Sequence, residues 1–134
     1  MERPADSSKD GSELLARLAG EEYCYVTTTG RVSGRPHEIE IWFGLSGHSL
    51  YLLSGGMDRS DWVKNMIKSP AVTVRIGKHT FQATARIVTD EGEEMTARNL
   101  VAEKYHELEP GNGLSNWALT SLPVAFDVSE ELQV

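Results

Sequence analysis

Cysteine, positive charge and long apolar runs are all scarce in this sequence. Among 134 residues there is one cysteine, Cys24, so no disulfide can form within the chain and a reducing cytoplasm is the expected setting. Lysine and arginine total 13 against 20 acidic residues, a net charge of -7. That balance argues against general binding to nucleic acid phosphates. No apolar run approaches the roughly 20 residues of a membrane span. The expected partners are therefore small molecules.

The usual catalytic and metal-binding motifs are also missing. The four histidines have neither a metal-ligand spacing nor a cysteine partner, so we expect no metal site. The chain contains no G-x-S-x-G, no Walker loop and no G-x-G-x-x-G. Ordinary hydrolase, kinase and Rossmann-type functions consequently have little support.

The residue patterns that are present predict one small α+β domain. We expect residues 1–11 to be a flexible lead and residues 12–134 to form the domain. Alternating and β-branched segments predict six strands, at 23–29, 37–45, 49–54, 71–76, 80–88 and 123–128. Two or three helices are expected, near 12–20, 60–68 and 91–105. Because the strands are joined as hairpins, the predicted fold is a six-stranded antiparallel split β-barrel.

The turn in "TTTGRVSGRP", residues 27–36, carries more chemistry than a hairpin requires. Gly30 and Gly34 permit unusual backbone angles, and consecutive turn amides can form an anion-binding nest. Arg31 and Arg35 could bind a phosphate through paired hydrogen bonds. The alternative is a solvated hairpin tip whose arginines only aid solubility.

A second polar turn, Ser54-Gly55-Gly56, leads into a predicted helix that contains Trp62 and Asn65. A glycine pair before a helix N-terminus can expose backbone amides to an anion. Trp62 and Asn65 are three residues apart and share one helical face, so an indole could stack on a flat ring while the amide contacts its edge. In the alternative, Trp62 is a core residue and Asn65 is exposed.

Together these two turns resemble the signatures of the deazaflavin-dependent nitroreductase family, small split β-barrels that bind F-420 or FMN. The first signature, roughly T-T-x-G-R-x-S-G-x-P, corresponds to residues 28–36 with a one-residue difference in how the threonines align. The second is roughly S-x-G-G followed by W-x-x-N and P-x-V-x-V, and it is represented here by Ser54, Gly55, Gly56, Asp61, Trp62, Asn65, Pro70, Val72 and Val74. The likeness extends over about residues 23–88. It departs from the family at Val32 and His37, where cations are common, and at Glu40-Ile41, where Pro-Leu is common.

The resemblance implies hydride transfer from reduced F-420 to an electron-poor acceptor such as a quinone, nitro compound or activated enone. Alternatives are an FMN-dependent oxidoreductase of the same fold and a non-catalytic protein that binds a flavin or lipid-like ligand. A homodimer is also expected from the resemblance. The implied cofactor-binding residues are Arg31, Ser33, Gly34, Arg35, Pro36, His37, Trp42, Ser54, Gly55, Gly56, Asp61, Trp62 and Asn65.

The resemblance also assigns a substrate-facing role to Tyr105, in the segment after the fifth strand. A tyrosine hydroxyl could polarise a substrate oxygen or donate a proton after the hydride arrives. A helical tyrosine that packs its ring into the core is the alternative.

Overall fold

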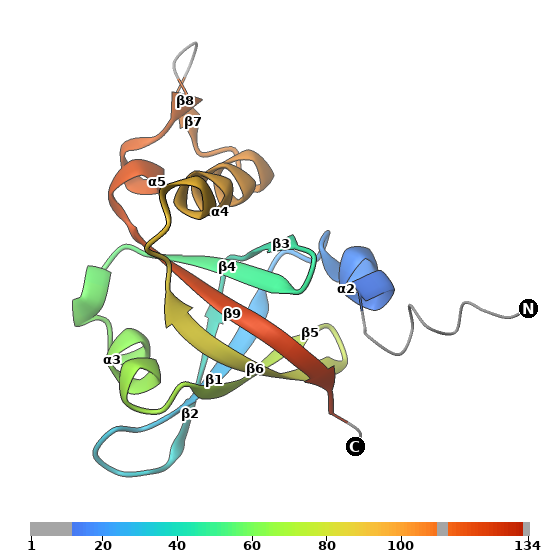
Figure 1. The fold of residues 1–134 in the computed structure, drawn as a ribbon, viewed down its shortest axis with the longest axis vertical. Coiled ribbons are helices and arrows are strands. Elements are labelled where there is room, and N and C mark those ends of the chain that lie inside the picture. Colours follow the sequence, from blue (N-terminus) through green and yellow to red (C-terminus); the bar gives the residue numbers. More distant parts are fainter. Residues whose placement is uncertain (1–11, 110–112, 133–134) are drawn as a thin grey trace, which may run out of the picture.

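The computed structural model describes residues 12–109 and 113–132, so the predicted lead at residues 1–11 lies outside the described part. A seven-stranded antiparallel sheet forms the body of the molecule (Figure 1). In spatial order its strands are β2 (Pro36–Ile41), β1 (Cys24–Thr29), β5 (Ala71–Ile76), β6 (His79–Ile87), β9 (Leu122–Glu131), β4 (Ser49–Ser54) and β3 (Gly44–Ser46).

The connection between β2 and β3 explains why the sheet curls. These strands lie at opposite edges of the sheet, yet only Trp42 and Phe43 separate them along the chain. A flat sheet would hold its outer strands about 29 Å apart, at about 4.8 Å per strand. Two linking residues span only about 10 Å. The sheet must therefore roll up until its edges approach, which gives the predicted split barrel.

The predicted strand at 37–45 is wrong in one respect, because it divides into β2 and β3. This division raises the main sheet from six strands to seven. Phe43 is fully buried at the corner, and Gly44 lies so close to α4 (Glu91–Lys104) that an added Cβ would sit 3.0 Å from Leu100 Cβ. The alternating pattern predicts which side chains face inward, but contains no signal for the point where the chain crosses between edges.

The barrel interior is filled by inward-facing side chains of the strands together with residues from the first and second helices. The largest fully buried side chains include Phe43, Phe81, Phe126, Leu15, Leu50, Leu52 and Met66. Leu15 comes from α2 (Ser12–Leu18) and Met66 from α3 (Asp61–Lys68). Both helices thus anchor to the same core, which fixes α3 relative to the neighbouring strands.

A separate lobe stands at one end of the barrel, at the top of Figure 1. It comprises α4, α5 (Asn116–Thr120) and the short hairpin of β7 (Leu108–Glu109) and β8 (Gly113–Leu114). The described residues thus contain four α-helices, with a 3-10 turn (Met57–Arg59) before α3. The short helix α5 was not among the helices predicted near 12–20, 60–68 and 91–105.

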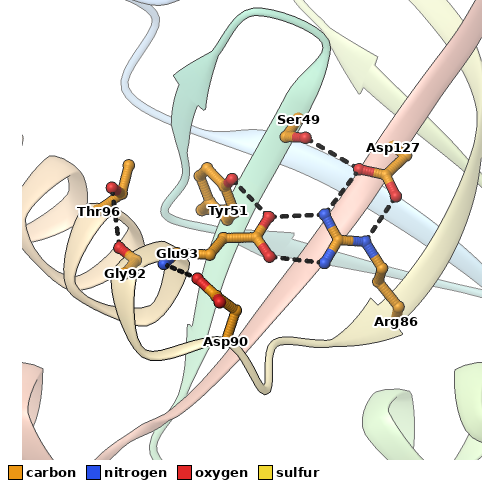
Figure 2. Close-up of polar contacts among 8 residues, drawn as sticks. All are labelled: Ser49, Tyr51, Arg86, Asp90, Gly92, Glu93, Thr96 and Asp127. Carbon is orange, nitrogen blue, oxygen red and sulfur yellow. Dashed lines mark hydrogen bonds and ion pairs between the residues drawn. The ribbon is translucent and has the colours of Figure 1, made fainter.

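Ion pairs hold the start of α4 against the sheet (Figure 2). The Arg86 guanidinium donates two hydrogen bonds to Glu93, at 2.8 and 2.6 Å, and two to Asp127, at 2.6 and 3.2 Å. Tyr51 donates to Glu93 at 2.7 Å, and Ser49 donates to Asp127 at 2.9 Å. We call these five residues the α4 clamp. They join α4 to strands β4, β6 and β9.

Candidate functional site

The first polar turn, between β1 and β2, is closed by its own hydrogen bonds. Gly30 N–H donates to the Arg35 carbonyl at 2.8 Å, and Gly34 N–H donates to the Gly30 carbonyl at 2.9 Å. The Ser33 hydroxyl accepts from Arg35 N–H at 3.1 Å. Gly34 has a φ of 74°, which favours glycine. Three amides of the predicted anion-binding nest are therefore engaged inside the turn.

Gly30 is required by close packing. A Cβ at this position would lie 2.7 Å from both His37 Nε2 and Ser33 Oγ. His37 pairs with Thr28 on the neighbouring strand, and its ring lies close to Gly30 at the start of the turn. The glycine therefore provides the space that the imidazole occupies.

Arg31 docks this turn onto α3. Its Nη1 donates to Asn65 Oδ1 at 2.9 Å, its Nη2 donates to Asp61 Oδ1 at 3.1 Å, and its backbone N–H also donates to Asn65 Oδ1 at 3.1 Å. Lys68 Nζ donates to the Arg31 carbonyl at 2.9 Å. Two segments thirty or more residues apart in the sequence are thus joined at one arginine.

Asn65 is the buried centre of this junction. It is only 4% exposed, and its Nδ2 donates to Thr28 Oγ1 at 3.2 Å while its Oδ1 accepts both Arg31 bonds. A buried side-chain amide is favourable only when its polar atoms find partners, as they do here. Asn65 is therefore neither exposed nor a free amide, and it holds the turn in place.

The junction forms one wall of a pocket of about 480 Å³, within the range of small-molecule sites. We call it the α3 pocket. The residues around it come from β1, the first turn, β2 and α3, and they are Thr28, Gly30, Arg31, Val32, Ser33, His37, Glu38, Ile39, Asp61, Trp62 and Asn65. Trp62 is half-buried, with its ring edge-on to Phe126 at a centroid distance of 6.3 Å, so it serves both the core and the pocket.

The charges around the α3 pocket do not favour an anion strongly. Arg31 is the one guanidinium among the residues that line it, and it is already paired with Asp61. Glu38 adds a second carboxylate, and it also faces Arg75 at 3.7 Å. Two carboxylates therefore stand against one arginine in the pocket wall.

The second polar turn lies beside α3 but does not line the α3 pocket. Ser54 is buried, and its hydroxyl donates to the Met57 carbonyl at 2.9 Å and contacts Ser60 Oγ at 2.9 Å. Ser60, the N-cap residue just before α3, makes no side-chain cap bond, because its hydroxyl faces Ser54. Gly55 lies against the Trp117 indole, where a Cβ would be 3.1 Å from Nε1. This turn thus connects α3 to the lobe.

Trp42 and Tyr105 meet at a different pocket, of about 350 Å³, lined by Gly20, Glu22, Trp42, Lys104, Tyr105 and His106. We call it the Trp42 pocket. The Trp42 and Tyr105 rings stack at 4.3 Å and 5°. The Tyr105 hydroxyl is 2.7 Å from the Glu22 carbonyl, to which it donates, and accepts from Phe43 N–H at 3.1 Å. Burial raises the pKa of Tyr105 to about 12, so its proton is held firmly.

Lys104 in the Trp42 pocket is a functional candidate without a distinctive sequence signal. Its Nζ donates to the Phe43 carbonyl at 3.1 Å and lies 3.5 Å from the Phe43 ring centroid. Burial lowers its pKa to about 8. A lysine in the last turn of a helix looks like an ordinary solvated residue in the sequence, so only the packing reveals it.

The structure divides the sequence-predicted site residues into groups. The α3 pocket brings together six of them, Arg31, Ser33, His37, Asp61, Trp62 and Asn65. Trp42 and Tyr105 line the other pocket. The remaining six lie in the two turns or at the strand ends beside them and do not line the α3 pocket; they are Gly34, Arg35, Pro36, Ser54, Gly55 and Gly56. The pocket-lining residues missing from the predicted site are Thr28, Gly30, Val32, Glu38 and Ile39. For Glu38 and Ile39, the place directly after His37 on an edge strand was a usable signal.

Neither a membrane-spanning helix nor a metal cluster is found in the described part of the chain. No helix there is both long and apolar enough to cross a bilayer. Histidine, cysteine, aspartate and glutamate side chains do not gather in threes around a common point in residues 12–109 and 113–132.

The family model described as F420H(2)-dependent quinone reductase matches residues 4–112 of this chain. That match includes both polar turns and the whole lining of the α3 pocket. No curated protein sequence matches the chain.

Solved structures share the fold at low sequence identity. A Bacteroides thetaiotaomicron protein, provisionally described as a 5-nitroimidazole antibiotic resistance protein, has a TM-score of 0.71 and 14% identity, covering 91% of this chain and 81% of that one. An F420-H2 dependent reductase has a TM-score of 0.61 and 22% identity, covering 81% and 94%. A Mesorhizobium loti FAD-binding protein has a TM-score of 0.64 and 14% identity, covering 89% and 87%. These similarities support the split-barrel fold.

Proposed function

Because this chain belongs to the F420H(2)-dependent quinone reductase family, we propose that it uses reduced F-420 to reduce a quinone or another electron-poor acceptor, such as a nitro compound or activated enone. When bound, F-420 supplies the hydride, and an acceptor quinone gains that hydride and a proton to become a hydroquinone. The chain is an oxidoreductase by family membership. What its own residues must supply is binding, orientation and exclusion of water.

The observation that carries the proposal is the junction between the first turn and α3. Both sequence signatures contribute walls to the α3 pocket, and its size suits part of a flat heterocyclic cofactor. Trp62 and Ile39 provide apolar contact for a ring, and Arg31 is positioned for an anionic group. Ser33 and His37 lie on the same rim. In this arrangement Asn65 holds Arg31 in position and does not itself contact the anionic group of the cofactor.

Fluorescence titration of the purified protein with F-420 and, separately, with FMN tests the cofactor assignment. We expect saturable F-420 binding in the wild type and a loss of at least about tenfold in Arg31→Ala, because a charge-assisted bond to phosphate contributes about 1.5–3 kcal/mol. Steady oxidation of reduced F-420 by a quinone should accompany binding. Absence of saturable F-420 binding would overturn the proposal.

A matched pair of tryptophan variants tests which pocket holds the ring. Trp62→Phe should weaken F-420 binding and reduce the quenching of tryptophan fluorescence, because Trp62 lines the α3 pocket. Trp42→Phe changes the Trp42 pocket instead. If Trp42→Phe loses cofactor and Trp62→Phe does not, the ring binds at the Trp42 pocket, and Tyr105 becomes the residue nearest to the chemistry.

FMN is the second candidate cofactor. One structural neighbour is described as an FAD-binding protein, and the single arginine of the α3 pocket suits one phosphate. A yellow protein on purification, with FMN bound more tightly than F-420 in the same titration, would favour this alternative.

A further inference from the structure

The bonding of Arg31 points to a competition inside the proposed cofactor site. Both terminal nitrogens of the guanidinium are engaged in this structure, one with Asn65 and one with Asp61. An anionic ligand that binds Nη1 or Nη2 of Arg31 from the α3 pocket must share that nitrogen with, or replace, the acceptor already bound to it. Which acceptor the ligand replaces depends on how firmly the rest of the protein holds each side chain, Asn65 or Asp61.

Asn65 is held on several sides and Asp61 is not. Asn65 is 4% exposed, bonds Thr28 from its own nitrogen and receives two bonds from Arg31. The Asp61 side chain is 85% exposed and meets Arg31 through one oxygen at 3.1 Å. Since an exposed ion pair contributes little against solvent, the carboxylate can turn away at small cost, whereas moving Asn65 would orphan buried polar atoms.

Asp61 also differs from the other carboxylate of the pocket. Glu38 lies at the rim on β2 and has its own cation, Arg75, on the outer side of the sheet. Asp61 has Arg31 as its partner and stands at the first residue of α3, where the helix start favours a negative group. A ligand phosphate and the Asp61 carboxylate would therefore compete for the same positive groups, the Arg31 guanidinium and the start of α3.

We propose that Asp61 is a built-in competitor of the anionic ligand, which binds by displacing the Asp61 carboxylate from Arg31 while Asn65 keeps the guanidinium in place. This inference rests on the proposed function. Asp61 then limits the affinity for anionic cofactors and favours their release, and it is a specificity-determining residue rather than a cofactor ligand. Because this competition comes from one side chain, a single substitution can distinguish it from the effect of the protein's net negative charge.

The test compares Asp61→Asn with Asp58→Asn. Both variants remove one negative charge near the start of α3, but Asp58 is exposed on the 3-10 turn and does not line the pocket. In F-420 titrations, Asp61→Asn should tighten binding between about two- and fivefold relative to the wild type, the range for a solvent-exposed charge pair. Asp58→Asn should change it much less. The gain should shrink at high salt.

Each outcome separates this inference from the proposed function. If the wild type binds F-420 and Asp61→Asn binds no more tightly than Asp58→Asn, the competition is wrong while the proposed function stands. If no variant binds F-420, the proposed function is wrong, and the same titration with FMN decides the inference. If Asp61→Asn binds FMN more tightly than the wild type and Asp58→Asn does not, the inference is supported. If Asp61→Asn does not bind FMN more tightly, or if no variant binds FMN, the inference is overturned.

Discussion

At the scale of single residues, the proposed site depends on close contacts that leave little room for change. Gly30 admits the His37 ring, and Asn65 satisfies buried partners on two segments. These two residues arrange the site without needing to touch a ligand. Arg31 and Trp62 supply the charge and the apolar surface.

Substitution of Gly30 by alanine should damage the α3 pocket more than it damages the fold. The new Cβ would meet His37 Nε2 and Ser33 Oγ at 2.7 Å, so the imidazole or the turn must move. We expect F-420 binding to weaken by at least about tenfold, with a stability loss of about 1–3 kcal/mol from overpacking. Titration and chemical denaturation measure the two effects.

Gly20→Ala is the matched control, since a Cβ there meets nothing within 4 Å. It should leave both binding and stability near the wild-type values. Equal binding by Gly30→Ala and Gly20→Ala would contradict the importance of the close approach at His37.

At the scale of elements, the position of α4 depends on the α4 clamp as well as on apolar packing. Arg86 places its planar guanidinium between Glu93 at the start of α4 and Asp127 on β9 (Figure 2). The hydrogen bonds to Arg86 are the largest cause that lowers the pKa of Glu93, and likewise that of Asp127. A planar group with several donors can serve two carboxylates at once, which a lysine ammonium cannot do in the same geometry.

We therefore expect Arg86→Lys to destabilise the protein although the charge is kept. The loss should be about 1 kcal/mol, since the pair is partly exposed and solvent screens it. Arg59→Lys, at an exposed position on the 3-10 turn, is the control and should be close to neutral. Urea denaturation of the three proteins at pH 7 gives the comparison. If Arg86→Lys were as stable as the wild type, helix packing alone would be shown to hold α4.

At the scale of the whole molecule, the α4 clamp should shape the response of stability to acid. Hydrogen bonding from Arg86, and then from Tyr51, lowers the pKa of Glu93 from 4.5 to about 2. Because the unfolded chain takes up this proton first, the stabilisation from Glu93 is complete above pH 4.5 and is lost as the pH falls towards 2.

Glu93→Gln removes this contribution and so provides the test. The wild type should be more stable than Glu93→Gln at pH 7, and the difference in unfolding free energy should decline between pH 4.5 and pH 2, where the native Glu93 titrates. Denaturation curves of both proteins across this interval measure the decline. A difference that stays constant with pH would contradict the assigned pKa.

The sequence alone predicts much of the fold because the relevant signals are local. Alternation, β-branched runs and turn residues predict the α+β class, the hairpins and the split barrel, and the helix at α3 ends at Lys68 as expected. The two signatures also identify the segments that border the α3 pocket. The crossing at Trp42 and Phe43 has no local signal, so the seventh strand was not predicted.

Only the tertiary structure decides which groups meet across the chain. It pairs Arg31 with Asp61 and Asn65 on α3, whereas the two alternatives from the sequence were a phosphate-binding arginine and a solvated one at a hairpin tip. It also separates Trp42 and Tyr105 from the α3 pocket and places the half-buried Lys104 beside them. Such pairings depend on how helices dock on the curled sheet. Docking is set by the long-range packing of the core, and therefore cannot be read from neighbouring residues.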